Sequence, residues 1–151
     1  AQHARMHSCK VQELSRIHDL RQIANQLLEA EVVIMKISEI RDLLDAEMLC
    51  GEENLDHEIY SACCSDMMSD VLAFMKDQAV LLTGLCNPQV IRTAEMMDVI
   101  CIVFVRGKTP DENMIELAKE RDIPLLTTGH RMFSACGILY EKGLRGGQSY
   151  E

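Results

Sequence analysis

Three uninterrupted apolar runs, residues 79–83, 99–105 and 123–127, constrain the fold of this 151-residue chain more than any other feature. Each run is followed by a polar turn and by the start of a predicted helix. Continuous apolar strands, unlike alternating ones, are typical of parallel sheets that are covered on both faces. The pattern therefore predicts an α/β fold, a three-layer α/β/α arrangement around a small, mainly parallel sheet.

Local start signals predict the helices around these strands. Asn87 precedes Pro88, a pair that starts helices because asparagine caps the first turn and proline fits the first helical position. The segment 109–112 likewise places a capping residue, Thr109, before Pro110, and adds acidic residues in the first turn. We expect Ser65 or Asp66 to cap another helix. The patterns predict helices over residues 36–44, 67–74, 88–97, 110–121 and 131–142, and short strands over 47–50 and 59–63.

The first 34 residues differ in pattern from the rest of the chain. Residues 10–31 carry apolar side chains at helical spacing, which predicts an amphipathic helix that packs on the domain, on a partner or on its own copy. Composition changes at Met35, so we interpret 1–34 as an N-terminal helical extension and hypothesise that Met35 is the native start. The domain itself is expected over 35–144, with a tail over 145–151.

Composition limits the cellular compartment and the classes of binding partner that we expect. No apolar run approaches the roughly 18 residues of a membrane helix, and no signal peptide is visible, which predicts a cytoplasmic protein without membrane contact. Seven cysteines without a C-x-x-C pair indicate free thiols in a reducing compartment and no metal site. The net charge of −9 argues against nucleic acid as a partner, because phosphate contacts dominate such binding.

The turns after the three apolar runs gather the candidate binding residues. In a parallel sheet these turns share one edge, and each precedes a helix whose first backbone N–H groups are free. Arg106, Lys108, His130 and Arg131 add positive charge, which suits an anionic small molecule. The alternative, left open, is that these glycines, threonines and Asn87 only shape turns and cap helices. The candidate ligand-binding residues are Ser65, Asp66, Thr83, Gly84, Asn87, Arg106, Gly107, Lys108, Thr127, Thr128 and His130.

Catalytic motifs are incomplete. The end of a phosphate-binding P-loop is suggested at 107–109, but Ile102 stands where that motif needs a glycine. Cys86 and His130 could form a nucleophile–base pair, yet nothing orients the histidine as a third member would. We therefore expect no enzymatic activity and no cofactor, while an unrecognised thiol or phosphotransfer reaction stays open as a third class.

Several segments together resemble the DRTGG domain family, in particular its short stand-alone members. The resemblance covers residues 35–144 and implies a three-layer fold similar to the N-terminal domain of HPr kinase/phosphorylase. It also implies a regulatory, non-catalytic role, as in modules beside CBS pairs in regulated pyrophosphatases. The signature that names the family is altered, with Cys86-Asn87 and Val105-Arg106-Gly107 at its positions. The matching segments are residues 35–40, 65–74, 83–85, 92–95, 104–110 and 123–128.

Two functions are consistent with these observations. The first is a regulatory, ligand-sensing module that binds a nucleotide or another phosphorylated metabolite at the strand ends. The alternative is a homodimeric protein-interaction subunit of a metabolic or redox complex without a small ligand. Family habit and the amphipathic first helix lead us to expect a homodimer in either case.

Overall fold

The computed structural model describes residues 15–24, 33–75 and 78–147, and the chain divides into two units, residues 1–32 and 33–151. In the first unit, residues 15–24 form a helix on which Ile17, Leu20 and Ile23 are at least half exposed. Residues 15–24 of the helix predicted over 10–31 are thus helical, residues 10–14 and 25–31 lie outside the described residues, and the packing of its apolar stripe stays a prediction. No described helix is long and apolar enough to cross a membrane.

A five-stranded sheet forms the middle layer of the second unit, in the order β2-β7-β6-β5-β4. Strands β4 to β7 run parallel to one another, and β2 pairs antiparallel with β7 at one edge. A separate two-stranded antiparallel sheet joins β1 (Met35–Lys36) to β3 (Glu58–Ile59). The strands of the large sheet are β2 (Glu47–Cys50), β4 (Ser61–Cys64), β5 (Ala79–Thr83), β6 (Cys101–Phe104) and β7 (Leu125–Thr127).

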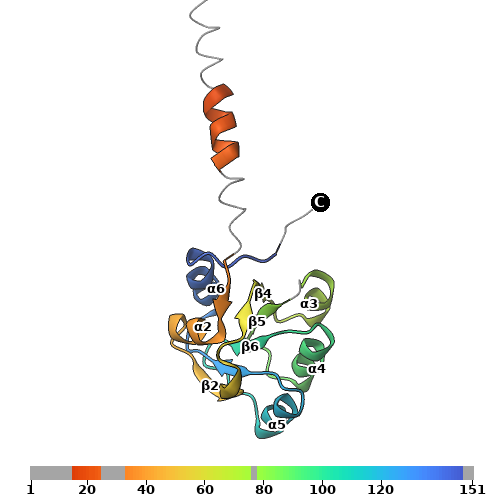
Figure 1. The fold of residues 1–151 in the computed structure, drawn as a ribbon. Helices are drawn as coiled ribbons and strands as arrows, with labels where there is room; N and C mark the ends of the chain where they lie inside the picture. Colours follow the sequence, from red (N-terminus) through yellow and green to blue (C-terminus); the bar gives the residue numbers. More distant parts are fainter. Residues whose placement is uncertain (1–14, 25–32, 76–77, 148–151) are drawn as a thin grey trace, which may run out of the picture. The chain divides into compact units, whose positions relative to one another are not determined.

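Helices cover both faces of the large sheet, which confirms the predicted α/β fold (Figure 1). On one face lie α2 (Ile37–Leu43) and α6 (Met132–Glu141). The other face is covered by α3 (Met68–Phe74), α4 (Pro88–Met96) and α5 (Glu112–Glu120). A short 3₁₀ helix, η1 (Glu52–Asn54), comes after β2.

The inner strands are buried on both faces, which explains their continuous apolar sequence. In β5, Val80 and Leu82 face the α2 and α6 layer, while Ala79 and Leu81 face α3, α4 and α5. Burying a valine or leucine side chain stabilises the folded state by about 1.5–3 kcal/mol. Strands with apolar side chains buried on both faces therefore contribute much of the stability with few residues. The sheet is therefore the rigid frame of this unit.

The helix start predicted at Asn87-Pro88 is confirmed, whereas α5 begins two residues after the predicted Pro110. Asn87 caps α4 by accepting a 2.8 Å hydrogen bond from the Gln89 backbone, and Pro88 opens that helix. Asp111 caps α5 by accepting from the Met114 backbone at 2.9 Å.

The predicted capping of α3 by Ser65 or Asp66 is wrong. Met67 is the N-cap residue of α3 and makes no side-chain capping bond. Ser65 Oγ instead accepts from the Met67 backbone at 3.0 Å, while the Asp66 carboxylate turns toward the end of β5. Long-range donors thus compete successfully for a side chain that local sequence assigns to a helix cap.

The expected strand over 59–63 is also corrected, because the chain switches sheets there. Ile59 belongs to β3 in the small sheet, whereas β4 begins at Ser61 in the large one. Arg145, placed in the predicted tail, lies against the edge of β4, where its carbonyl accepts from the Ala62 N–H at 2.9 Å.

A substitution at Gly51 tests how closely the end of β2 packs against Pro124. Gly51 has a φ of +85°, and a Cβ there would lie 2.7 Å from the Cα of Pro124, just before β7. We expect Gly51→Ala to lower the free energy of unfolding by about 2 kcal/mol, through left-handed strain and the backbone clash. Urea denaturation measures the change.

Gly137→Ala is the matched control. Gly137 lies on the exposed side of α6, and nothing lies within 4 Å of a Cβ built there. Because alanine is the better helix former, this variant should gain up to about 1 kcal/mol. Equal losses in both variants would contradict the described packing of Gly51.

Candidate functional site

The carboxyl ends of β5, β6 and β7 lie side by side at one edge of the sheet. Thr83 is aligned with Phe104, and Phe104 with Thr127, so the turns after these strands are neighbours. We call the three turns, residues 83–87, 106–109 and 127–130, the strand-end rim. The expected gathering of Thr83, Arg106 and Thr127 at one edge is thus confirmed.

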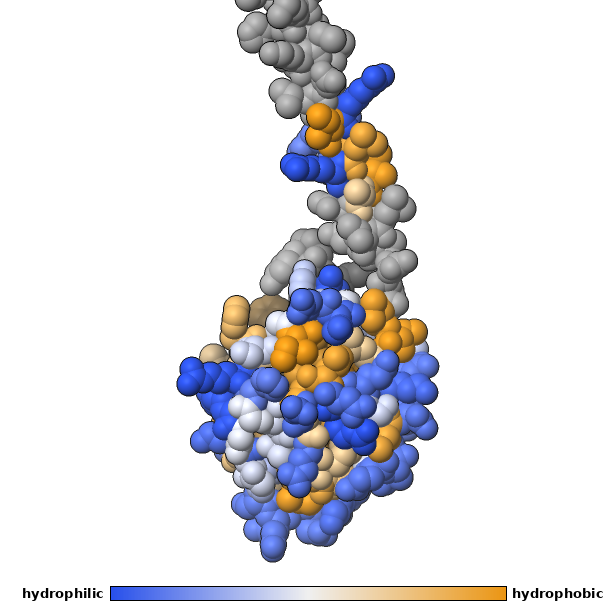
Figure 2. Space-filling view, turned by 90° about the vertical axis from the view of Figure 1, so that its left-hand side faces the viewer, coloured by the Kyte–Doolittle hydropathy of each residue, from blue (hydrophilic) through white to orange (hydrophobic). Residues whose placement is uncertain are grey.

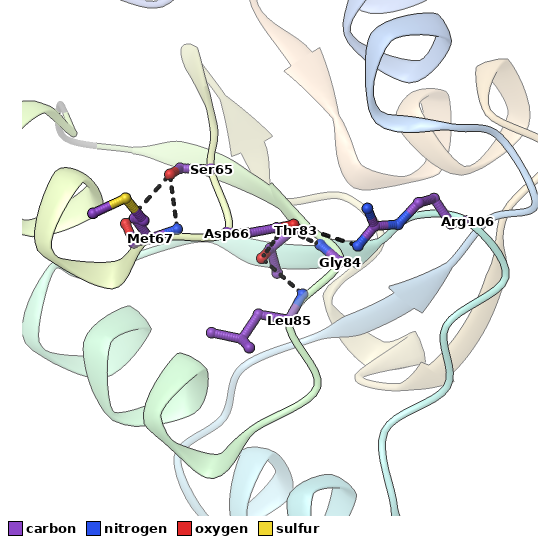
Figure 3. A network of polar contacts seen from close by, with 7 residues as sticks. All are labelled: Ser65, Asp66, Met67, Thr83, Gly84, Leu85 and Arg106. Atoms are coloured by element: carbon purple, nitrogen blue, oxygen red, sulfur yellow. Dashed lines mark hydrogen bonds and ion pairs between the residues drawn. The ribbon is translucent and has the colours of Figure 1, made fainter.

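A single carboxylate organises one side of the strand-end rim. Asp66 Oδ1 accepts hydrogen bonds from the Gly84 backbone N–H at 2.6 Å and from the Thr83 hydroxyl at 3.1 Å. Its other oxygen, Oδ2, pairs with Nη2 of Arg106 at 3.3 Å. Figure 3 shows these donors around Asp66. Asp66 therefore bridges the segment before α3 to the turns after β5 and β6.

Thr83 and Gly84 are shaped for this contact. The Thr83 side chain is fully buried, and its hydroxyl accepts from the Leu85 N–H at 3.2 Å while donating to Asp66. At Gly84 a Cβ would collide with the guanidinium of Arg106, which lies directly across this residue. The absence of a side chain at Gly84 thus allows Arg106 to reach Asp66.

The turn after β6 is bonded to the turn after β7. Arg106 and Gly107 adopt left-handed φ angles of 61° and 65°. The Arg106 N–H donates to the His130 carbonyl, and the Gly107 N–H donates to the Thr128 carbonyl, both at 2.8 Å. These N–H groups, like that of Gly84, already have acceptors within the protein, so they are not free to bind a ligand.

Several candidate side chains have structural partners. Thr128 is buried, and its hydroxyl donates to the Leu44 carbonyl at 2.6 Å while accepting from the His130 N–H. The Thr127 hydroxyl donates to the Lys108 carbonyl at 2.8 Å. Together with the cap at Asn87, these bonds fix the shape of the strand-end rim and favour the scaffold interpretation for these three side chains.

Positive charge remains unpaired on the other side of the strand-end rim. Among the described residues, no carboxylate lies within ion-pair distance of Lys108 or Arg131, in contrast to Arg106. Lys108 lies near the Cys86 thiol, whose pKa is raised by burial, lowered by Lys108 and raised by Asp111. The raised pKa keeps Cys86 protonated and disfavours it as a nucleophile.

A small hollow lies at the opposite edge of the sheet, where β2 ends and β7 begins. It has a volume of about 50 Å³ and is lined by residues that include Cys50, Gly51, Lys119 and Asp122. Pockets for drug-sized ligands measure about 300–1,000 Å³, so this space suits water-sized molecules. Within the described ranges, no three histidine, cysteine or acidic side chains are placed to hold a metal ion.

A comparison with protein-family models shows to which family this chain belongs. The sequence model of the DRTGG domain matches residues 39–141. The chain belongs to the DRTGG domain family. The matched range includes Asp66, Gly84 and Arg106, so the strand-end rim is part of the family domain. No curated protein sequence matches the chain.

The DRTGG fold is also found in a solved structure. The CBS and DRTGG domains of the regulatory region of Clostridium perfringens pyrophosphatase, complexed with the activator diadenosine tetraphosphate, match with a TM-score of 0.58 and 24% identity. The match covers 69% of this chain and 45% of that one, so this chain spans less than half of its relative. At this identity the likeness shows the fold. Similarity to HPr kinase stays a prediction.

Removal of the Asp66 carboxylate tests its bridging role. Asp66→Ala leaves the Gly84 N–H and the Thr83 hydroxyl without their acceptor, which should lower the free energy of unfolding by about 1–2 kcal/mol. Asp70→Ala, an exposed acid in the first turn of α3, should cost about 0.5 kcal/mol or less. Urea denaturation of both variants compares them, and equal effects would contradict the bridge.

Proposed function

We propose that this DRTGG domain is a non-catalytic regulatory module that senses a nucleotide or another phosphorylated metabolite at the strand-end rim. The observation that carries the proposal is the donor set around Asp66. A guanidinium, a backbone N–H and a hydroxyl converge there on one anionic group. Phosphate oxygens accept from the same donors, and arginine pairs with phosphate and carboxylate alike. The pyrophosphatase relative, with its diadenosine tetraphosphate activator, supports a nucleotide as the ligand class.

Without ligand, the Asp66 carboxylate occupies the donors that a phosphate group would otherwise bind. Its ion pair with Arg106 is about half exposed, and such pairs contribute about 0–1 kcal/mol, so a phosphate can displace it at little cost. Lys108 and Arg131 attract the incoming anion, because no described carboxylate neutralises them. Exchange at Arg106 would remove one of the three contacts that hold Asp66 and so loosen the segment before α3, while the bonds from Thr83 and Gly84 remain.

Thermal unfolding with ligand tests this function. Diadenosine tetraphosphate or ATP should raise the melting temperature of the full chain, by mass action that reaches about 2.7 kcal/mol at a hundredfold excess over Kd. The double variant Arg106→Ala and Lys108→Ala should lose the shift. Asp66→Asn, which removes the competing charge, should bind up to about fivefold more tightly.

The control is a double variant with the same charge change at the far end of α5. Lys119→Ala and Arg121→Ala removes two cations, both of which pair with exposed carboxylates as Arg106 does. This variant should keep the ligand shift. Loss of the shift in the control, or no shift in the unmodified chain with either compound, would refute ligand sensing at the strand-end rim.

Exposed apolar side chains favour a second function, a homodimeric interaction subunit. On α6, Phe133 is 89% exposed and Tyr140 is 61% exposed. Figure 2 shows apolar side chains gathered between hydrophilic ones on the face covered by α2 and α6. Clusters of exposed apolar surface mark interaction sites more often than isolated residues do. We propose a second copy of the chain as the occupant of this face.

Sedimentation measures the oligomeric state directly. A homodimer through the α6 face should have twice the 17.1 kDa mass of the chain, and Phe133→Ser should weaken it at least tenfold. Phe74→Ser, on the opposite helical layer, should leave the dimer intact. A monomer at all concentrations would exclude the homodimer without bearing on ligand binding.

A further inference from the structure

Two cysteines far apart in the sequence meet at the edge of the sheet. Cys64 ends β4, and Cys136 lies in α6, 72 residues later, with their Sγ atoms 2.9 Å apart. Side chains alternate along a strand, so Ala62 and Cys64 face the α6 layer while Cys63 faces the other core. Both thiols are free, and Cys64 is exposed to solvent.

We propose that Cys64 and Cys136 form a reversible dithiol–disulfide pair that a hydroperoxide oxidises, so that this module carries a redox-sensitive site. The proposal goes beyond ligand sensing and does not depend on it. The contact between the sulfur atoms, the exposure of Cys64 and the partial exposure of Cys136 are the observations that carry this proposal.

The chemistry of the pair assigns the two roles. The hydrogen bond to Cys64 lowers the pKa of Cys136 to about 7, and the same contact raises the pKa of Cys64. With hydrogen peroxide as the oxidant, the Cys136 thiolate attacks one oxygen, the O–O bond breaks and Cys136 becomes a sulfenic acid. The other oxygen leaves as hydroxide, which takes up the proton that Cys136 had lost and becomes water. The Cys64 thiol then attacks that sulfur and displaces water. In total, two thiols and one peroxide molecule give one disulfide and two water molecules.

The other described cysteines are poor competitors. Burial raises the pKa of the Cys50, Cys63 and Cys86 thiols. It raises the pKa of the fully buried Cys101 thiol further. Within the described part of the chain, Cys136 is therefore the cysteine with a lowered pKa. Thiolate character and exposure decide which thiols are oxidised, so reaction should begin at Cys136.

Peroxide treatment of the reduced full chain tests the proposal. Mass spectrometry should find two hydrogen atoms lost, two thiols fewer and a disulfide-linked peptide that joins Cys64 to Cys136. The melting temperature should rise by about 5 °C or more, because the bond closes a long loop, and a dithiol reductant should reverse it. Cys136→Ser and Cys64→Ala should prevent both changes. The controls Cys63→Ala and Cys86→Ser should keep them.

Alkylation across neutral pH gives a readout that does not depend on stability. Cys136 should react first, with a midpoint near pH 7, and Cys64→Ala should move that midpoint up toward the ordinary thiol value of about 8.5. An intermolecular disulfide, a bond from Cys63 instead of Cys64, or oxidation spread evenly over the thiols would overturn the proposal. So would an unchanged midpoint in Cys64→Ala.

Discussion

Parallel pairing of β5, β6 and β7 in one register is the constraint on which the other features depend. Because these strands have helices on both faces, every side chain in β5 is buried, and Thr83 at its end is buried too. The same pairing sets Thr83, Phe104 and Thr127 in line. The turns after these strands must then meet, so the composition of the core and the position of the strand-end rim have one cause.

That cause also explains how much the sequence could predict. Uninterrupted apolar runs identify two-sided strands, and Asn87-Pro88 identifies a helix start, because each signal is local. The partners of Asp66 lie 17, 18 and 40 residues away, and the Thr128 hydroxyl bonds a carbonyl 84 residues away. No local pattern specifies such contacts. The sequence therefore predicted the edge and its residues but missed which polar groups bond one another.

Many polar groups of the strand-end rim are already bonded within the protein. Its backbone donors at Gly84, Arg106 and Gly107 are already bonded within the protein, so a ligand would gain affinity mainly from side-chain charge. In the proposed function the ligand would bind by exchange, since it would have to offer Arg106 a better partner than Asp66. A domain with net charge −9 would repel small anions except where cations lack nearby carboxylates, as Lys108 and Arg131 do among the described residues.

A single residue, Ser65, separates the Cys64 thiol at the end of β4 from the Asp66 carboxylate beside β5. Cys64 contacts α6 on one helical layer, and Asp66 contacts the turns after β5 and β6. A disulfide at Cys64 would restrain the segment that a ligand must move to displace Asp66. Oxidation should then weaken ligand binding, and ligand should by the same factor disfavour the disulfide, because coupling between two sites is reciprocal. If both proposals hold, the segment from Cys64 to Asp66 would connect redox state to metabolite level.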